Sequence, residues 1–192
     1  MATGSALLNA DALLARTGLA SGMRVADLGC GATGHLIIPA ALLVGEHGKA
    51  YAVDIQRSAL AATESKAKLD SVSVITYIWS DLERDAATPI PAGSLDVALL
   101  VSTLHLTNDR AAVLREAARL VRGGGRVLVV EWKPIASVMG PPAERRVPED
   151  ALIATAQEVG LTFRERFDAG PQHYGVLFVK GDAGVTSHGT TL

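Results

Sequence analysis

The sequence is poor in cysteine and in aromatic residues, and each scarcity excludes a class of structure. Cys30 is the single cysteine among 192 residues, so the chain forms no intrachain disulfide and no cysteine-based metal cluster. Aromatic residues make up 4% of the chain while 48% of it is apolar, which indicates a core built from alanine, leucine and valine. This composition is typical of a packed α/β protein, and the length suits one domain.

Long hydrophobic runs and a strong net charge are also missing. The longest apolar run, around residues 36–44, is too short to span a bilayer, and the first residues do not read as a signal peptide. We therefore expect a cytoplasmic protein. The net charge of −2 provides no overall basic field for nucleic acid or an anionic membrane. Neither an H-x-x-x-H nor an H-x-E pattern occurs, so no metal site is expected.

A glycine-rich turn dominates the first quarter of the chain. A short strand at 24–28 and a buried helix at 35–44 flank a G-x-G-x-x-G turn formed by Gly29, Gly31 and Gly34. Glycine lets the backbone approach a ligand, and a following helix directs free N–H groups at it. A second strand ends at Asp54, 20 residues after Gly34, where an acid can bind both hydroxyls of a ribose. The pattern predicts a site for an adenosine-containing cofactor.

Asp27, immediately before this turn, distinguishes between such cofactors. A carboxylate beside the turn would repel the pyrophosphate of a dinucleotide and attract a cationic amino group. S-adenosylmethionine carries such an amino group and no phosphate. A structural role for Asp27 stays open, in which its carboxylate accepts hydrogen bonds from the backbone of the turn.

Five segments of the chain, in this order, resemble the class I S-adenosylmethionine-dependent methyltransferases, and in particular their small stand-alone domains. They are D-L-G-C-G-A-T-G from Asp27, A-V-D-I at 52–55, S-D-L-E at 80–83, and residues 96–105 and 120–132. The resemblance implies a three-layer Rossmann-like α/β fold. It also implies a seven-stranded, mostly parallel sheet in the order 3-2-1-4-5-7-6, with an antiparallel last strand. The implied activity is methyl transfer from S-adenosylmethionine, which leaves S-adenosylhomocysteine.

The rest of the pattern agrees with β/α units followed by a final strand pair. Helices are expected at 58–70, 108–122 and 148–160, and strands at 72–78, 95–101, 126–131, 161–167 and 174–180. Thr107 or Asn108 can cap the helix at 108–122, and Gly123 can stop it. We expect an N-terminal segment at 1–22, one methyltransferase domain at 23–180, and a disordered tail at 181–192.

Ligands of such sheets bind at the carboxyl ends of the parallel strands, and this rule selects the expected cofactor contacts. Asp54 is expected to bind the ribose, against a solvated strand end, and Ile55 to pack on the adenine. The resemblance implies that Asp81 reaches the adenine amino group, although Asp81 could instead cap a short turn. The complete expected set is Asp27, Gly29, Gly31, Gly34, Asp54, Ile55, Asp81, Leu82 and Ser102. The resemblance implies that Leu82 contributes its backbone N–H to the adenine ring and that Ser102 lies below the methionine part of the cofactor. Trp79 is either a core residue or a wall of the adenine site.

Histidine offers the one candidate for a catalytic group. His105 could be a general base that faces the methyl group, or a buried histidine bonded to the backbone. His173 is expected in the last hairpin loop, at the opposite edge of the sheet unless the hairpin curls. His35 is expected in the first turn of the helix at 35–44. Cys30 is either a thiol activated by a helix N-terminus or a small buried residue.

The methyl acceptor is less defined by the sequence than the cofactor. The loop V-S-T-L-H after the fourth strand lacks the N-P-P-Y pattern of amide and adenine methylation, and we expect a small-molecule acceptor, with a macromolecule as the alternative. Residues 1–22 and residues 133–147 are two candidate lids over the substrate. Alternatively, residues 1–22 only cover the sheet, and residues 133–147 only connect two elements. An NAD(P)-dependent reductase and a non-catalytic cofactor-binding protein are the rival interpretations.

Overall fold

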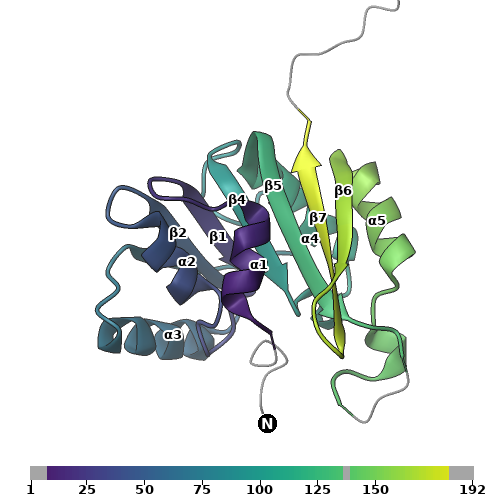
Figure 1. The fold of residues 1–192 in the computed structure, drawn as a ribbon, viewed down its shortest axis with the longest axis horizontal. Coiled ribbons are helices and arrows are strands. Elements are labelled where there is room, and N and C mark those ends of the chain that lie inside the picture. The colour runs from purple at the N-terminus through teal and green to yellow at the C-terminus, as the bar shows by residue number, and fades with distance from the viewer. Residues whose placement is uncertain (1–7, 136–138, 182–192) are drawn as a thin grey trace, which may run out of the picture.

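The computed structural model describes residues 8–135 and 139–181, in which seven strands form one sheet (Figure 1). The strands are β1 Arg24–Leu28, β2 Lys49–Asp54, β3 Ile75–Trp79, β4 Leu95–Val101, β5 Val121–Trp132, β6 Leu161–Asp168 and β7 His173–Lys180. Their order is β3-β2-β1-β4-β5-β7-β6, with β1 to β5 parallel and β7 antiparallel to both of its neighbours. The predicted fold class and strand order are confirmed.

Helices cover both faces of this sheet. They are α1 Ala10–Thr17, α2 Ile37–Val44, α3 Arg57–Leu69, α4 Arg110–Leu120 and α5 Glu149–Glu158, with the short 3-10 helices η2 Leu104–Leu106 and η3 Ala143–Arg145. Alternate residues of β4 enter two cores: Val97 and Leu99 pack on the side of α1 and α2, and Ala98 and Leu100 on the side of α4 and α5. Figure 1 shows α1 and α2 in front of the sheet and α4 behind it. Across residues 8–135 and 139–181, no helix has the length and apolar character needed to cross a membrane.

The helix after the glycine turn starts two residues later than predicted. It begins at Ile37, so His35 lies in the turn itself and not in the first helical turn. Pro39 explains the boundary, because proline lacks a backbone N–H and fits a helix only within its first turn. The N-terminal end of α2 still faces the turn, as a cofactor-binding helix requires.

The boundaries of α4 also differ from the prediction. Asp109, and neither Thr107 nor Asn108, caps this helix, since its carboxylate accepts a 2.9 Å hydrogen bond from the backbone N–H of Ala112. The helix ends at Leu120, and β5 begins at the next residue, so Gly123 lies within a strand and stops no helix. The pairing of β5 with β4 shifts register across this glycine run, which can take up extra residues because glycine tolerates positive φ.

The first helix covers the sheet. Leu13 and Leu14 of α1 belong to the core that contains the strand residue Leu128, and the Arg126 side chain donates to the carbonyl oxygen of Thr17. Just before α1, the carbonyl oxygen of Leu8 lies 2.7 Å from Nε2 of His35. The described part of the N-terminal segment is therefore bound to both the sheet and the glycine turn. The expected tail at 181–192 lies outside the described residues, apart from Gly181.

Candidate cofactor and methyl-transfer site

Hydrogen bonds to β2 hold the glycine turn in place. The N–H groups of Gly29 and Cys30 donate to the carbonyl oxygen of Val53 at 2.8 and 3.0 Å. The N–H of Gly31 donates to the Oδ2 atom of Asp54 at 2.9 Å. The turn is thus fixed between the tips of β1 and β2, where the predicted ligand would lie.

Positive backbone φ angles explain why the turn needs glycine. The φ angles of Gly29, Gly31 and Gly34 are +89°, +62° and +61°, in a region that side chains disfavour. A Cβ at Gly29 would come within 2.6 Å of the Thr103 side chain, and one at Gly34 within 2.7 Å of Ile38. At Gly31, by contrast, no described atom lies within 4 Å of such a Cβ, so this part of the turn faces open space.

Asp27 is a buried carboxylate that lacks a hydrogen-bond donor among the described residues. It is 3% exposed, and its burial together with the nearby Asp54 raises its pKa to about 7. The alternative role, in which Asp27 accepts bonds from the backbone of the turn, is not what the described residues show. Those bonds go to Val53 and Asp54 instead. A cationic group placed beside Asp27 would compensate this carboxylate, so its role as a cofactor contact stays a specific prediction.

Asp54 is not a solvated strand end. It is 7% exposed, and its two oxygens accept bonds from the N–H groups of Gly31 and Gln56 at 2.9 and 2.8 Å. A carboxylate has about four acceptor positions, so lone pairs are left for the hydroxyls of a ribose. Asp54 therefore has a structural role in the turn in addition to the predicted role in binding.

The tips of β2 and β3 form an exposed apolar surface. Ile55 and Trp79 are each about half exposed, and the indole N–H of Trp79 donates to the carbonyl oxygen of Ile55 at 2.7 Å. The Arg57 guanidinium lies 4.4 Å from the centre of the Trp79 ring. Of the two alternatives for Trp79, this exposure excludes a core residue, and an adenine wall stays the prediction.

Asp81 and Leu82 follow β3 at the same edge. Asp81 accepts a 3.1 Å bond from the N–H of Glu83, which is the turn-capping role considered as its alternative. The Leu82 side chain is buried, and its backbone N–H donates to no described residue. The adenine contacts of both residues stay predictions.

Ser102 is a strained residue at the tip of β4. Its φ of +54° is unusual for a residue other than glycine, and its hydroxyl oxygen is buried without a hydrogen-bond partner among the described residues. Next to it, the Thr103 hydroxyl donates to the carbonyl oxygen of Leu28 at 3.1 Å. This bond joins the loop after β4 to the glycine turn.

His105 forms a buried pair with a residue that sequence reasoning missed as a functional group. Nδ1 of His105 lies 3.0 Å from Oε2 of Glu131, a fully buried residue near the end of β5. The other carboxylate oxygen of Glu131 accepts a 2.6 Å bond from the N–H of Leu104. The feature of the sequence that could have identified Glu131 was its position as an acidic residue in the otherwise apolar run V-L-V-V-E-W.

The prediction for His173 is wrong. His173 is the first residue of β7 and pairs with Trp132 at the end of β5, which places it at the same edge as the other strand tips. Its ring lies 4.2 Å from that of Trp132, and its Nε2 atom is buried without a partner among the described residues. Burial lowers the pKa of His173 to about 4, so this imidazole is neutral at ordinary pH. An antiparallel strand begins where its neighbour ends, which the sequence-based placement overlooked.

Two adjacent arginines organise the loop at 133–147. Arg146 is buried and donates to the carbonyl oxygens of Lys133, Ile135, Met139 and Pro141. Arg145 donates to the carbonyl oxygens of His105 and Leu106 at 3.0 and 2.9 Å. The described parts of the loop are thus attached to η2 at the strand tips, and residues 136–138 lie outside the description.

Cys30 lies within the glycine turn as a buried thiol. Burial, together with Asp27 and Asp54, raises the pKa of this thiol well above its usual range. The structure therefore favours a small packed residue over an activated nucleophile. No group of three or more histidine, cysteine or acidic residues that could hold a metal occurs in the described parts of the chain.

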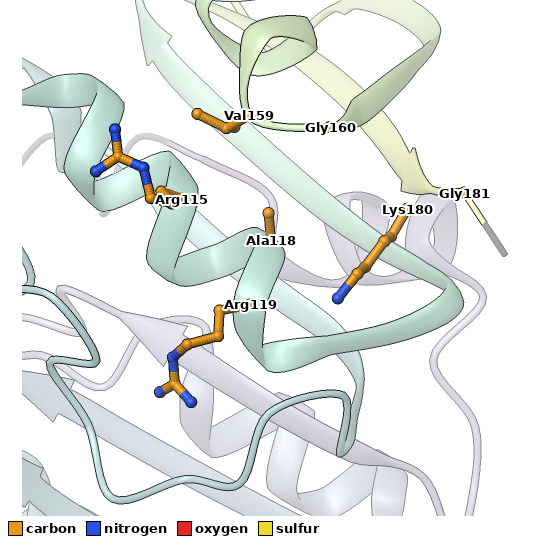
Figure 2. Close-up of a pocket in the computed structure, with 7 residues that line it drawn as sticks. All are labelled: Arg115, Ala118, Arg119, Val159, Gly160, Lys180 and Gly181. Carbon is orange, nitrogen blue, oxygen red and sulfur yellow. The ribbon is translucent and has the colours of Figure 1, made fainter. Parts of the chain in front are cut away.

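A separate hollow of about 390 Å³ lies at the opposite edge of the sheet, where β5 begins and β7 ends (Figure 2). Three cationic residues line it: Arg115, Arg119 and Lys180. Arg119 binds the buried Glu116 at 2.7 Å, and Lys180 donates to the carbonyl oxygen of Val121 at 2.9 Å. Arg115 lies 4.0 Å from Asp85, so all three cations have partners within the fold, and the hollow lies away from the strand tips.

Comparison with known proteins places this geometry in a family. A family model described as a methyltransferase domain matches residues 26–129, more than half of the chain. A ubiquinone/menaquinone biosynthesis C-methyltransferase of Shewanella oneidensis is 34% identical over 125 residues, which cover 64% of this chain and 48% of the relative. The chain thus spans about half the length of the curated relatives it matches.

Solved structures show the same fold. A SAM-dependent methyltransferase from Aquifex aeolicus superposes with a TM-score of 0.81 at 24% identity, covering 90% of this chain and 89% of the other. An arsenic(III) S-adenosylmethionine methyltransferase from Chlamydomonas reinhardtii gives a TM-score of 0.69 at 25% identity, covering 86% of this chain and 66% of the other.

The chain belongs to the methyltransferase domain family, in its class I Rossmann-like form. This assignment agrees with S-adenosylmethionine as the predicted cofactor, and the strand tips carry a glycine turn and carboxylates. Neither the reductase nor the non-catalytic interpretation gains support from these comparisons.

Proposed function

We propose that this protein transfers the methyl group of S-adenosylmethionine to a small-molecule acceptor. The observation that carries the proposal is Asp27, a buried carboxylate without a donor among the described residues, beside the glycine turn. The amino group of the cofactor supplies the missing positive charge. The sulfonium is already a strong electrophile, so the protein mainly has to align donor and acceptor and exclude water.

The remaining contacts follow from the positions of the strand tips. Asp54 would bind the ribose, while Ile55 and Trp79 would enclose the adenine on their exposed faces. Asp81 and the backbone N–H of Leu82 would bind the adenine edge. Ser102, with its buried hydroxyl and positive φ, would lie under the methionine part.

A small acceptor with an apolar part fits the other half of the site. Leu106, Ile135 and Met139 are exposed apolar residues near the tips of β4 and β5, on segments that Arg145 and Arg146 bind together. The Shewanella oneidensis relative is named as a C-methyltransferase of ubiquinone and menaquinone biosynthesis, which supports an aromatic carbon as the acceptor atom. Alkylated phenols and hydroquinones are therefore the first acceptors to test.

Calorimetric titration tests the cofactor part of the proposal. S-adenosylmethionine and S-adenosylhomocysteine should bind, whereas NADH should not, because Asp27 would repel its pyrophosphate. Binding of NADH that equals or exceeds that of S-adenosylhomocysteine would overturn the proposal.

Transfer of a labelled methyl group from S-adenosylmethionine to alkylated hydroquinones then tests the activity. The buried Asp27→Asn variant is the matched control, since it should lose both cofactor affinity and turnover. A cytoplasmic location stays part of this proposal, and cell fractionation tests it separately.

A further inference from the structure

We propose that Glu131 positions His105 as the general base that removes a proton from the methyl acceptor. This inference deepens the proposed function and depends on it, because it requires an acceptor at the tips of β4 and β5. His105 would be the catalytic residue, and Glu131 a positioning residue that acts through it.

The hydrogen bonds of Glu131 determine which nitrogen of His105 carries the proton. One carboxylate oxygen accepts from the N–H groups of Leu104 and His105 at 2.6 and 3.4 Å, so this oxygen acts as an acceptor. The other oxygen lies 3.0 Å from Nδ1 of His105. A carboxylate only accepts, so Nδ1 carries the hydrogen and Nε2 keeps its lone pair.

Nε2 of His105 is directed away from this pair and remains available. No described residue forms a hydrogen bond with it, and it is not among the fully buried polar atoms that lack a partner. The His105 side chain is 10% exposed. An imidazole that is held through one nitrogen and open at the other has the geometry of a general base.

The surroundings connect His105 to both halves of the site. Two residues before it, the Thr103 hydroxyl binds the strand end that precedes the glycine turn. On the other side, Arg145 from the loop at 133–147 donates to the His105 carbonyl oxygen. His105 therefore lies between the cofactor turn and the exposed apolar residues that we assign to the acceptor.

The charged and titratable groups around His105 come from four elements. Glu131 of β5 is its partner, Arg110 of α4 and Arg145 of η3 donate to the carbonyl oxygens of Leu104 and His105, and His173 of β7 lies nearby. His173 stays neutral because its pKa is lowered to about 4. Glu131 is thus the group that faces the His105 imidazole with a negative charge.

The proposed step balances without a further reactant. The acceptor atom supplies the electron pair for a new bond to the methyl carbon. The carbon–sulfur bond breaks at the same time, and the electron pair of that bond stays on sulfur, which leaves S-adenosylhomocysteine. Nε2 of His105 takes the proton from the acceptor, either from the hydroxyl of a hydroquinone or from the methylated ring carbon. The imidazolium then faces Glu131 and releases its proton to solvent.

Imidazole nitrogen NMR tests the positioning without any acceptor. Wild-type His105 should be protonated on Nδ1 and not on Nε2. In Glu131→Gln, the backbone N–H groups of Leu104 and His105 should orient the new amide oxygen towards themselves. The amide NH₂ group would then face Nδ1, and because it donates a hydrogen bond, the imidazole proton should move to Nε2. His35 serves as an internal reference, because its Nε2 must donate to the Leu8 carbonyl oxygen in both proteins. Wild-type His105 protonated on Nε2 would overturn the positioning role.

Kinetics with an alkylated hydroquinone test the base itself. Glu131→Gln and His105→Ala should each lower kcat by about 10²–10⁴-fold, the usual contribution of general-base catalysis, with unchanged affinity for S-adenosylhomocysteine. The pH profile of kcat should differ between wild type and His105→Ala, because only the wild type carries the proposed base. Added imidazole should restore part of the turnover of His105→Ala, which a merely structural histidine would not allow.

Glu116→Gln is the matched control for the loss of a buried carboxylate. Glu116 is 3% exposed and bound to Arg119 at the far side of α4, so its variant measures the effect on stability without touching the site. If His105→Ala had the kcat and the pH profile of the wild type, the role of His105 as the general base would be overturned. Failure of the wild-type protein to bind S-adenosylhomocysteine would instead overturn the proposed function, while the NMR result would still decide the tautomer.

Discussion

At the residue scale, we expect Asp27 to couple stability, pH and ligand binding. Its pKa is raised from 3.8 to about 7 by burial and by Asp54, so the folded protein holds this proton more tightly than the unfolded chain does. The free energy of unfolding should therefore fall as the pH rises from about 4 to about 7, and stay lower above that range. One pKa unit corresponds to about 1.4 kcal/mol, so the total effect is a few kcal/mol at most.

Asp27→Asn should consequently stabilise the free protein at about pH 8, with a gain that vanishes toward about pH 4. Thermal unfolding at several pH values measures this difference. Wild-type affinity for S-adenosylhomocysteine should increase as the pH rises through about 7 and then level off, because the ammonium group requires the ionised carboxylate. In Asp27→Asn the affinity should be weaker at about pH 8 and nearly independent of pH in this range. A variant that binds as tightly as wild type would remove Asp27 from the cofactor site.

Asp54 requires a gentler substitution than alanine, because its carboxylate also holds Gly31 and Gln56. Asp54→Asn keeps one acceptor oxygen and removes the charge. We expect at least a tenfold loss of S-adenosylhomocysteine affinity, since hydrogen bonds to charged groups contribute about 1.5–3 kcal/mol. Calorimetry on the variant, with circular dichroism as evidence of folding, makes the measurement. Unchanged affinity in the folded variant would place the ribose elsewhere.

At the scale of elements, the loop at 133–147 depends on one buried side chain. Arg146 donates to four carbonyl oxygens within this loop, and lysine cannot reproduce that planar set of donors. Arg146→Lys should therefore leave buried carbonyls unpaired and lower the free energy of unfolding by about 2–4 kcal/mol. Amide exchange should become faster at residues 133–135 and 139–147, while S-adenosylhomocysteine affinity stays near that of wild type.

The exposed Arg122, which pairs with Asp96 at 2.8 Å, provides the control for this substitution. Arg122→Lys should change the free energy of unfolding by less than about 1 kcal/mol, as is usual for exposed ion pairs. If Arg146→Lys were equally mild, the loop would owe its structure to other contacts, such as the close packing of Gly140 on Trp132.

At the scale of the whole molecule, the regular part of the fold could be predicted from residue patterns. Strand β4 is apolar throughout except at Asp96, and this pattern correctly indicated burial on both faces. The short connection after β6 correctly indicated an antiparallel pair. The ends of the helices and strands were harder to predict. Strand β5 begins directly after Leu120 and contains the glycine run that, in the sequence, indicated the end of a helix.

The local structure of the proposed cofactor site was determined by the sequence alone. A glycine turn between a strand and a helix, with acids before it and at the next strand tip, depends on neighbours within about 30 residues along the chain. Backbone geometry and strand direction are enough to place Asp27, the glycines and Asp54 at one edge. The order of these features therefore predicted the cofactor before any contact was known.

The tertiary structure alone decided which side chains meet at the half of the site that we propose for the acceptor. Glu131 reaches His105 across 26 positions, and Arg145 reaches the same residue across 40. His173 lies against Trp132 because β7 runs antiparallel to β5 and begins where that strand ends. Such contacts depend on which strands are neighbours in the sheet. Residue types and spacing do not encode that neighbourhood directly, so an acid in an apolar strand became a partner of His105 only once the sheet was assembled.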